Sequence, residues 1–243
     1  MRDVLNSLRH TLAFAGRELY TYFVSPIAYV VAFGFLLIMG FLFALIVTTS
    51  NEASLRGTFG NMGVVLLLMS PVLTMRLIAE ETRTGTIELL MTSPVRDWEI
   101  VVGKFLGGLG FLFVMLLLTG WYPLLLFRLG NPDPGPIISG YLGIFLLAAA
   151  MLAVGMLTSS LTENQIVAAV LAFGALLILY LLGAAANIIG QPLSGLFQYM
   201  GFSDRLTDFL QGVIDSRSVI YYLSVIVGAL FLTTRSLEAR RYR

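Results

Sequence analysis

Long apolar stretches separated by short charged islands dominate the sequence. A helix needs about 20 residues to cross the hydrocarbon core of a bilayer, and every stretch except the last reaches that length. The pattern predicts spans at Ile27–Thr49, Phe59–Ala79, Val101–Phe127, Ile138–Ser160, Gln165–Asn187 and Val219–Thr234. Pro71 and Pro123 fall within the second and third spans, where we expect kinks. The predicted fold class is an all-α integral membrane protein with six transmembrane helices.

Residues 1–25 precede the first span and have a different pattern. Apolar residues recur there at spacings of three and four, which places them on one face of a helix: Leu8, Leu12, Ala15, Leu19 and Tyr22. Arg9, Arg17 and Glu18 fall between them and are expected to face lipid headgroups or water. We therefore predict an N-terminal elbow helix that lies in the membrane interface. The alternative is a cytosolic amphipathic helix that packs on a partner.

The distribution of basic residues predicts the orientation of the spans, because cytoplasmic loops are enriched in Lys and Arg. If the N-terminus is cytoplasmic, eleven basic residues lie inside, at positions 2, 9, 17, 76, 83, 96, 104, 235, 240, 241 and 243. Only four lie outside, at positions 56, 128, 205 and 217. An even number of spans then places both termini in the cytoplasm.

Residues 188–218, between the fifth and sixth spans, are predicted to be external and are only half polar. Their apolar residues suggest two short helices that dip into the outer interface: Leu196, Phe197, Met200, Phe202, Leu206, Phe209, Leu210 and Val213. The break between the two helices is expected at Gly201–Asp204, with Ser203 or Asp204 as the N-cap of the second.

Composition excludes several classes of function. Hydrophobic residues make up 58% of the 243 residues and charged residues 12%, whereas about a quarter of an average soluble domain is charged. The chain has no cysteine and one histidine, which excludes disulfides, thiolate metal sites and bis-histidine haem ligation within one chain. A net charge of +1 gives no reason to expect a nucleic-acid partner.

No catalytic or nucleotide-binding motif is present. The Gly103–Lys104 pair is followed by Phe105, and Trp98 stands where a P-loop needs its first glycine. The central parts of the six spans contain no Asp, Glu, Lys or Arg, so no obvious ion-coupling site is offered. Gly103 and Gly107 form a G-x-x-x-G pair, which allows close helix packing, within this subunit or against another.

The segment between the second and third spans carries the most information. We expect the second helix to continue past the membrane through Glu80 and Glu81 and to break at Gly85. A short new helix then follows, capped by Thr84 or Gly85, with Glu88 in its first turn and Ile87, Leu90 and Met91 on one face. Pro94 ends it, and Asp97 is the expected cap of the third span. The alternative is an ordinary polar connector on the membrane surface.

The run from Ala79 to Lys104, AEETRTGTIELLMTSPVRDWEIVVGK, resembles ATP-binding-cassette permeases of the type-2 exporter family. More narrowly, it is similar to their gliding-motility and nitrous-oxide-reductase-maturation branches. The resemblance covers nearly the whole chain as one permease domain, 1–243, with a cytoplasmic coupling region at 80–96. It implies that the coupling region docks on a separate ATPase subunit through Glu80, Glu81, Gly85, Thr86, Ile87, Glu88, Leu89, Leu90 and Met91.

The resemblance also implies a set of partners. A second permease, identical or related, would pair with this chain, and some relatives accompany a subunit with a large extracytoplasmic domain. ATP and Mg would be bound by the ATPase, and this chain would bind no cofactor or metal. The expected location is a prokaryotic inner membrane, and the expected function is ATP-driven export or mechanotransmission. The alternatives are a secondary carrier or channel, or a membrane anchor or scaffold for an extracytoplasmic protein.

Overall fold

The computed structural model describes residues 2–50, 53–86, 95–186 and 194–241. Within these ranges all regular structure is helical. The helices are α1 (Arg2–Val24), α2 (Pro26–Ser50), α3 (Arg56–Thr74), α4 (Ala79–Arg83), α6 (Asp97–Thr119), α7 (Trp121–Leu129), α8 (Pro134–Ser160), α9 (Gln165–Ala186), α10 (Ser194–Met200), α11 (Phe202–Leu210) and α12 (Ser216–Arg241).

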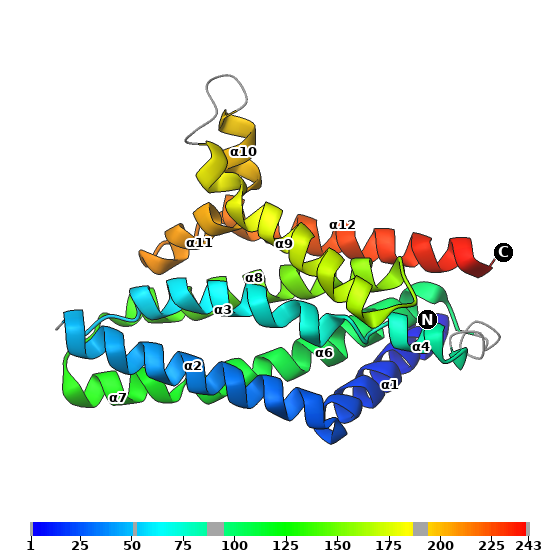
Figure 1. Cartoon of the computed structure of the whole chain (residues 1–243), viewed down its shortest axis with the longest axis horizontal. Coiled ribbons are helices and arrows are strands. Elements are labelled where there is room, and N and C mark those ends of the chain that lie inside the picture. The colour runs from blue at the N-terminus through cyan, green and yellow to red at the C-terminus, as the bar shows by residue number, and fades with distance from the viewer. Residues whose placement is uncertain (1, 51–52, 87–94, 187–193, 242–243) are drawn as a thin grey trace.

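The six predicted spans are confirmed as helices long and apolar enough to cross a membrane. They comprise α2, α3 with α4, α6 with α7, α8, α9 and α12. Figure 1 shows α2, α3, α6 and α8 running along the long axis, and the N- and C-termini at the same end. We call this the termini end. The chain is a multi-pass membrane protein.

Helix α8 lies at the centre of the bundle, where it packs against α3, α6, α9, α11 and α12. Every residue from Leu146 to Met156 is buried. Alanine and glycine recur along this stretch, and small side chains let neighbouring helices approach closely where no hydrophobic effect drives association.

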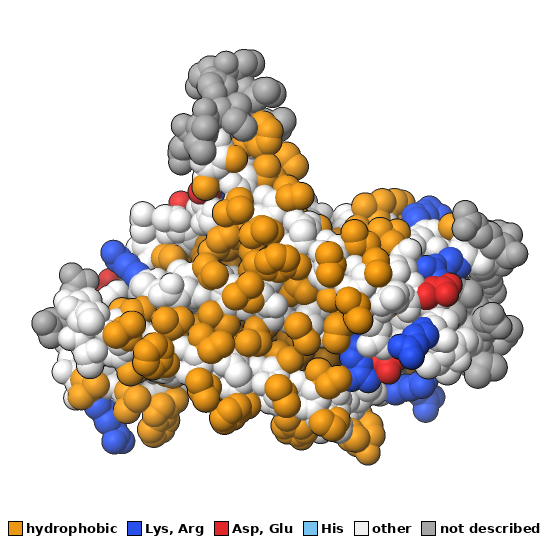
Figure 2. Space-filling model, viewed as in Figure 1, with side chains coloured by type: hydrophobic (Ala, Val, Ile, Leu, Met, Phe, Trp, Pro, Cys, Tyr) orange, Lys and Arg blue, Asp and Glu red, His pale blue; other side chains and the backbone are white. Residues whose placement is uncertain are grey.

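The surface of the molecule is divided into an apolar middle and charged ends. Figure 2 shows apolar side chains across the middle of the molecule and charges gathered toward its ends, mostly at the termini end.

The kink predicted at Pro123 is a break between two helices. Helix α6 ends at Thr119, and α7 begins at Trp121. Proline has no N–H to donate to the carbonyl four residues earlier, which here is that of Thr119. The Tyr141 hydroxyl donates to this carbonyl at 2.8 Å instead, so the break leaves no buried acceptor unpaired at this position.

Two short helices precede the last span, as predicted. The predicted N-cap of the second is wrong, because Gly201 caps α11. Ser203 instead donates to the Tyr180 carbonyl at 3.1 Å, and Asp204 lies in the first turn. Three apolar side chains of α11 are buried where it packs on α3, α8 and α9: Phe202, Leu206 and Phe209.

Candidate functional site

The second span continues through Glu80 and Glu81 to Arg83, as predicted, but it is not one unbroken helix. Helix α3 ends at Thr74, residues 75–78 form a turn, and α4 starts at Ala79. Pro71 weakens the helical ladder one turn earlier because it lacks an N–H. At the turn the Leu77 N–H donates to Thr74 at 3.1 Å rather than to Leu73. The carbonyls of Leu73 and Met75 are therefore left without helical donors.

Side chains from two other helices form hydrogen bonds with the backbone groups that this break leaves unpaired. The Tyr22 hydroxyl of α1 donates to the Leu73 carbonyl at 2.9 Å. The Ser159 hydroxyl of α8 donates to the Met75 carbonyl at 3.1 Å and accepts from the N–H groups of Ile78 (3.2 Å) and Ala79 (3.0 Å). Burial raises the pKa of the Tyr22 phenol, which keeps it a neutral donor. The break is thus fixed to α1 and α8.

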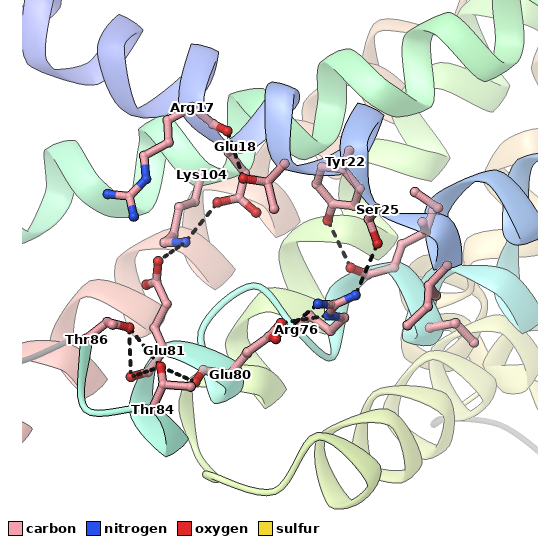
Figure 3. Close-up of a pocket in the computed structure, with 15 residues that line it drawn as sticks. Arg17, Glu18, Tyr22, Ser25, Arg76, Glu80, Glu81, Thr84, Thr86 and Lys104 are labelled. Atoms are coloured by element: carbon pink, nitrogen blue, oxygen red, sulfur yellow. Dashed lines mark hydrogen bonds and ion pairs between the residues drawn. The ribbon is translucent and has the colours of Figure 1, made fainter.

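A buried lysine links three helices beside the break. Lys104 of α6 lies with its Nζ 2.9 Å from Glu18 Oε2 of α1 and 2.8 Å from Glu81 Oε1 of α4 (Figure 3). The lysine side chain is only 6% exposed. A buried charge is tolerated only when paired and hydrogen-bonded, and the two carboxylates supply these partners. Glu18 was predicted to face headgroups or water, but its carboxylate points toward this lysine and its side chain is only 15% exposed.

Two glycines allow α1 to come this close to α6. A Cβ at Gly103 would lie 2.5 Å from the Phe14 Cβ and 2.8 Å from the Thr11 carbonyl oxygen. A Cβ at Gly107 would lie 2.5 Å from the Glu18 Cβ. The G-x-x-x-G pair is therefore used for packing within the subunit, one of the two alternatives above. The face of α1 toward α6 includes buried Thr11 and Tyr22, whereas Leu8 and Leu12 point outward.

Arg76 fixes the start of the turn to α4 and to the α1–α2 connection. Its guanidinium donates to both Glu80 oxygens, at 2.6 and 3.0 Å, and to the Ser25 hydroxyl at 3.2 Å. We call residues 75–78, α4 and the side chains of Tyr22, Arg76, Lys104 and Ser159 the joint. It brings α1, α3, α4, α6 and α8 together at the termini end.

A second polar cluster holds the N-terminal half of α1 to α6. The buried Glu99 carboxylate accepts from the Ser7 hydroxyl and from the Arg96 backbone N–H at 3.3 Å, and His10 Nδ1 lies 3.3 Å away. Serine, histidine and a carboxylate meet here, but Ser7 donates to Glu99 and not to His10. This arrangement does not activate a nucleophile. Arg96 is the N-cap of α6, so the prediction that Asp97 caps this helix is wrong.

The predicted coupling residues divide into two groups. Glu80 and Glu81 point into the joint, toward Arg76 and Lys104. Gly85, with φ +72°, follows the end of α4, as its predicted role as a break requires, and Thr86 Oγ1 lies 2.9 Å from Thr84 Oγ1. The other five lie outside the described residues: Ile87, Glu88, Leu89, Leu90 and Met91. Within the described ranges no group of three potential metal ligands is found.

Ser159→Ala tests whether the Ser159 hydroxyl holds the break between α3 and α4 in place. The change leaves two buried N–H groups and one carbonyl without partners, at a cost of about 1–3 kcal/mol. We expect the thermal midpoint of the purified protein to fall by roughly 5 °C. The matched control is Ser160→Ala, since this equally buried hydroxyl donates only within its own helix, to Leu157. Equal midpoints for the two variants would contradict the assigned role of Ser159.

Comparison with known proteins identifies the family of this chain. Residues 44–211 match the model of a family described as "ABC-2 family transporter protein". Over 133 residues the chain is 29% identical to the "Probable multidrug ABC transporter permease YbhS" of Escherichia coli K12, and equally to that of Escherichia coli O157:H7. These alignments cover 51% of this chain and 33% of each relative, so the chain matches only about a third of their length. Because the family model covers more than half of the chain, the protein belongs to the ABC-2 family of transporter proteins.

Proposed function

We propose that the chain is the permease subunit of an ATP-binding-cassette transporter whose nucleotide site lies on a separate subunit. Family membership supports a permease, and the sequence lacks a P-loop of its own. The proposed activity is export or mechanotransmission driven by ATP hydrolysis on that partner. In this reading ATP and Mg bind to the partner ATPase, and the chain itself supplies a moving membrane element.

The observation that carries the proposal is the attachment of α4. A short helix at the end of a span would transmit little motion if a loose loop connected it to the bundle. Here Lys104 binds α4 to α1 and α6, and Ser159 binds the preceding turn to α8. A force applied to α4 is therefore passed to three helices rather than absorbed in the turn.

This attachment assigns different roles to the coupling residues. Glu80 and Glu81 position α4, because each carboxylate is paired within the chain. Contact with the ATPase is left to the exposed end of the segment, which includes Arg83, Thr84, Gly85 and Thr86. Ile87, Glu88, Leu89, Leu90 and Met91 complete the proposed docking segment by resemblance to the type-2 exporters.

The proposed assembly contains two permeases, identical or related, and two ATPase subunits in a prokaryotic inner membrane. Both termini would be cytoplasmic, which places the joint on the side where a soluble ATPase can reach it. Membership in the gliding-motility or nitrous-oxide-reductase-maturation branch, and with it an auxiliary extracytoplasmic subunit, remains part of the proposal.

Affinity purification of the tagged chain from its native membrane in mild detergent tests this assignment. We expect a soluble P-loop ATPase to copurify with the chain at a ratio of one to one. A stable complex with an extracytoplasmic protein and no ATPase would instead favour a scaffold. A lone oligomer that supports ion-gradient-driven flux in liposomes would favour a carrier or channel.

A further inference from the structure

A pocket of about 270 Å³ opens next to the joint. Five elements line it: the C-terminal half of α1, the first turn of α2, the last turn of α3, α4, and α6 through Lys104 (Figure 3). Its lining includes the charged side chains of Arg17, Glu18, Glu81 and Lys104.

The pocket lies at the depth of lipid headgroups. Ile27 and Ala28, which line it, belong to the first turn of a membrane span, and Val72 and Leu73 to the last turn of α3, just before the break within another span. The ends of spans lie at the boundary between hydrocarbon and headgroups. Tyr20, which is 70% exposed, lines the hollow next to this pocket, and exposed aromatic residues are typical of this boundary.

A more open hollow adjoins the pocket and is largely apolar. It shares Thr21, Ser25, Ile27 and Arg76 with the pocket and adds Tyr20, Val24 and Pro26. A polar chamber next to an apolar surface fits an amphiphile that has a charged head and hydrocarbon chains. The pocket is smaller than the roughly 300–1,000 Å³ of sites for drug-sized ligands, so it has room for a headgroup and not for a whole lipid.

The charges of the pocket favour a zwitterion. Three basic and three acidic side chains line it: Arg17, Arg76, Lys104, Glu18, Glu80 and Glu81. Arg76 is paired with Glu80, and Lys104 faces two carboxylates, which leaves one negative charge in excess. Arg17 carries the balancing positive charge and forms no ion pair with any residue that the structure describes. One cation and one excess carboxylate charge therefore face the same small space.

We propose that this pocket binds the headgroup of a phospholipid that carries a primary amine, of the phosphatidylethanolamine class. The phosphate lies against the guanidinium of Arg17, which donates to it. The ammonium lies against the carboxylates of Glu18 and Glu81, where its N–H groups donate. The acyl chains lie over the apolar hollow beside Tyr20 and Val24. A choline headgroup has no N–H to donate, and a glycerol headgroup has no positive charge for the carboxylates.

Native mass spectrometry of the full chain, purified with any subunits that accompany it, tests the proposal. The protein is titrated with phosphatidylethanolamine, phosphatidylcholine and phosphatidylglycerol that have identical acyl chains. We expect one ethanolamine lipid per chain to bind on the order of tenfold more tightly than either of the others, the ratio that one charged hydrogen bond supplies. Equal binding of the three lipids would overturn the proposal.

Two variants locate the site. Arg17→Ala is expected to weaken binding of phosphatidylethanolamine by about tenfold and to leave the thermal midpoint unchanged, because its side chain is exposed. Arg9→Ala is the matched control, since Arg9 is an exposed arginine of the same helix outside the pocket. Unchanged binding in Arg17→Ala, or equal loss in Arg9→Ala, would refute the site. Displacement of the lipid by soluble glycerophosphoethanolamine at equal concentration would show a soluble ligand and overturn the lipid assignment.

Discussion

Lys104→Met is expected to lower the thermal midpoint of the purified protein by about 10 °C. The change leaves two carboxylates, only 15% and 21% exposed, facing each other without a cation. Removing one partner from a buried ion pair costs about 3 kcal/mol or more, and 1 kcal/mol corresponds to roughly 2–4 °C in a chain of this size. The midpoint is measured by intrinsic fluorescence in detergent.

Two further variants separate this effect from a general loss of charge. Arg235→Met removes an exposed cation, paired with Glu238 and 61% exposed, and should cost less than about 1 kcal/mol. Lys104→Met combined with Glu18→Gln and Glu81→Gln should recover most of the lost stability, because no unpaired charge remains. A triple variant as unstable as Lys104→Met alone would show that the charges are not the cause.

Gly107→Val is expected to separate α1 from α6 and to break the ion pair between Glu18 and Lys104. The new side chain cannot be accommodated by a rotamer change, because the Ala15 carbonyl oxygen lies 2.9 Å from the position of the Cβ. We expect a loss of about 1–3 kcal/mol. The native sequence has no cysteine, so spin labels at Leu12→Cys and Leu106→Cys, both exposed, can report the separation as a longer and broader distance distribution.

Gly16→Val is the control for this experiment. Gly16 lies on α1, the other helix of this contact, and nothing approaches within 4 Å of the position of its Cβ. The distances between the two spin labels and the thermal midpoint of Gly16→Val should match those of the spin-labelled protein that keeps both glycines. If Gly107→Val also left the distance distribution unchanged, the tight contact between α1 and α6 would be refuted.

The fold could be predicted from the sequence because a membrane span is surrounded by hydrocarbon along its whole length. An apolar run of about 20 residues has few alternatives to a helix in a bilayer, since every backbone group must be satisfied within the segment. All six spans were located in this way. Gly85 was also predicted correctly as a break, because glycine readily adopts the positive φ that is found there.

The joint could not be predicted because its contacts join distant parts of the chain. The break after Thr74 depends on Pro71, but it is stable only because Ser159 and Tyr22 supply its missing hydrogen bonds. Glu18 was assigned to the polar face of α1 because helical periodicity cannot show that a lysine lies opposite. One signal was available: Lys104 is the only lysine among 15 basic residues, and it stands at the edge of a predicted span beside two glycines.

The most direct test of the proposed coupling mechanism is ATP turnover, in lipid nanodiscs, by the complex of this chain with the ATPase subunit proposed above. Glu81→Gln is the variant of choice, because Lys104 keeps Glu18 as a partner while α4 loses its charged link to α6. Glu163→Gln, an exposed carboxylate 3.7 Å from Arg240, is the control. We predict that the complex with Glu81→Gln assembles but loses most of the stimulation of ATP hydrolysis that the permease confers, whereas the control retains it. Parental stimulation in Glu81→Gln would contradict the mechanism.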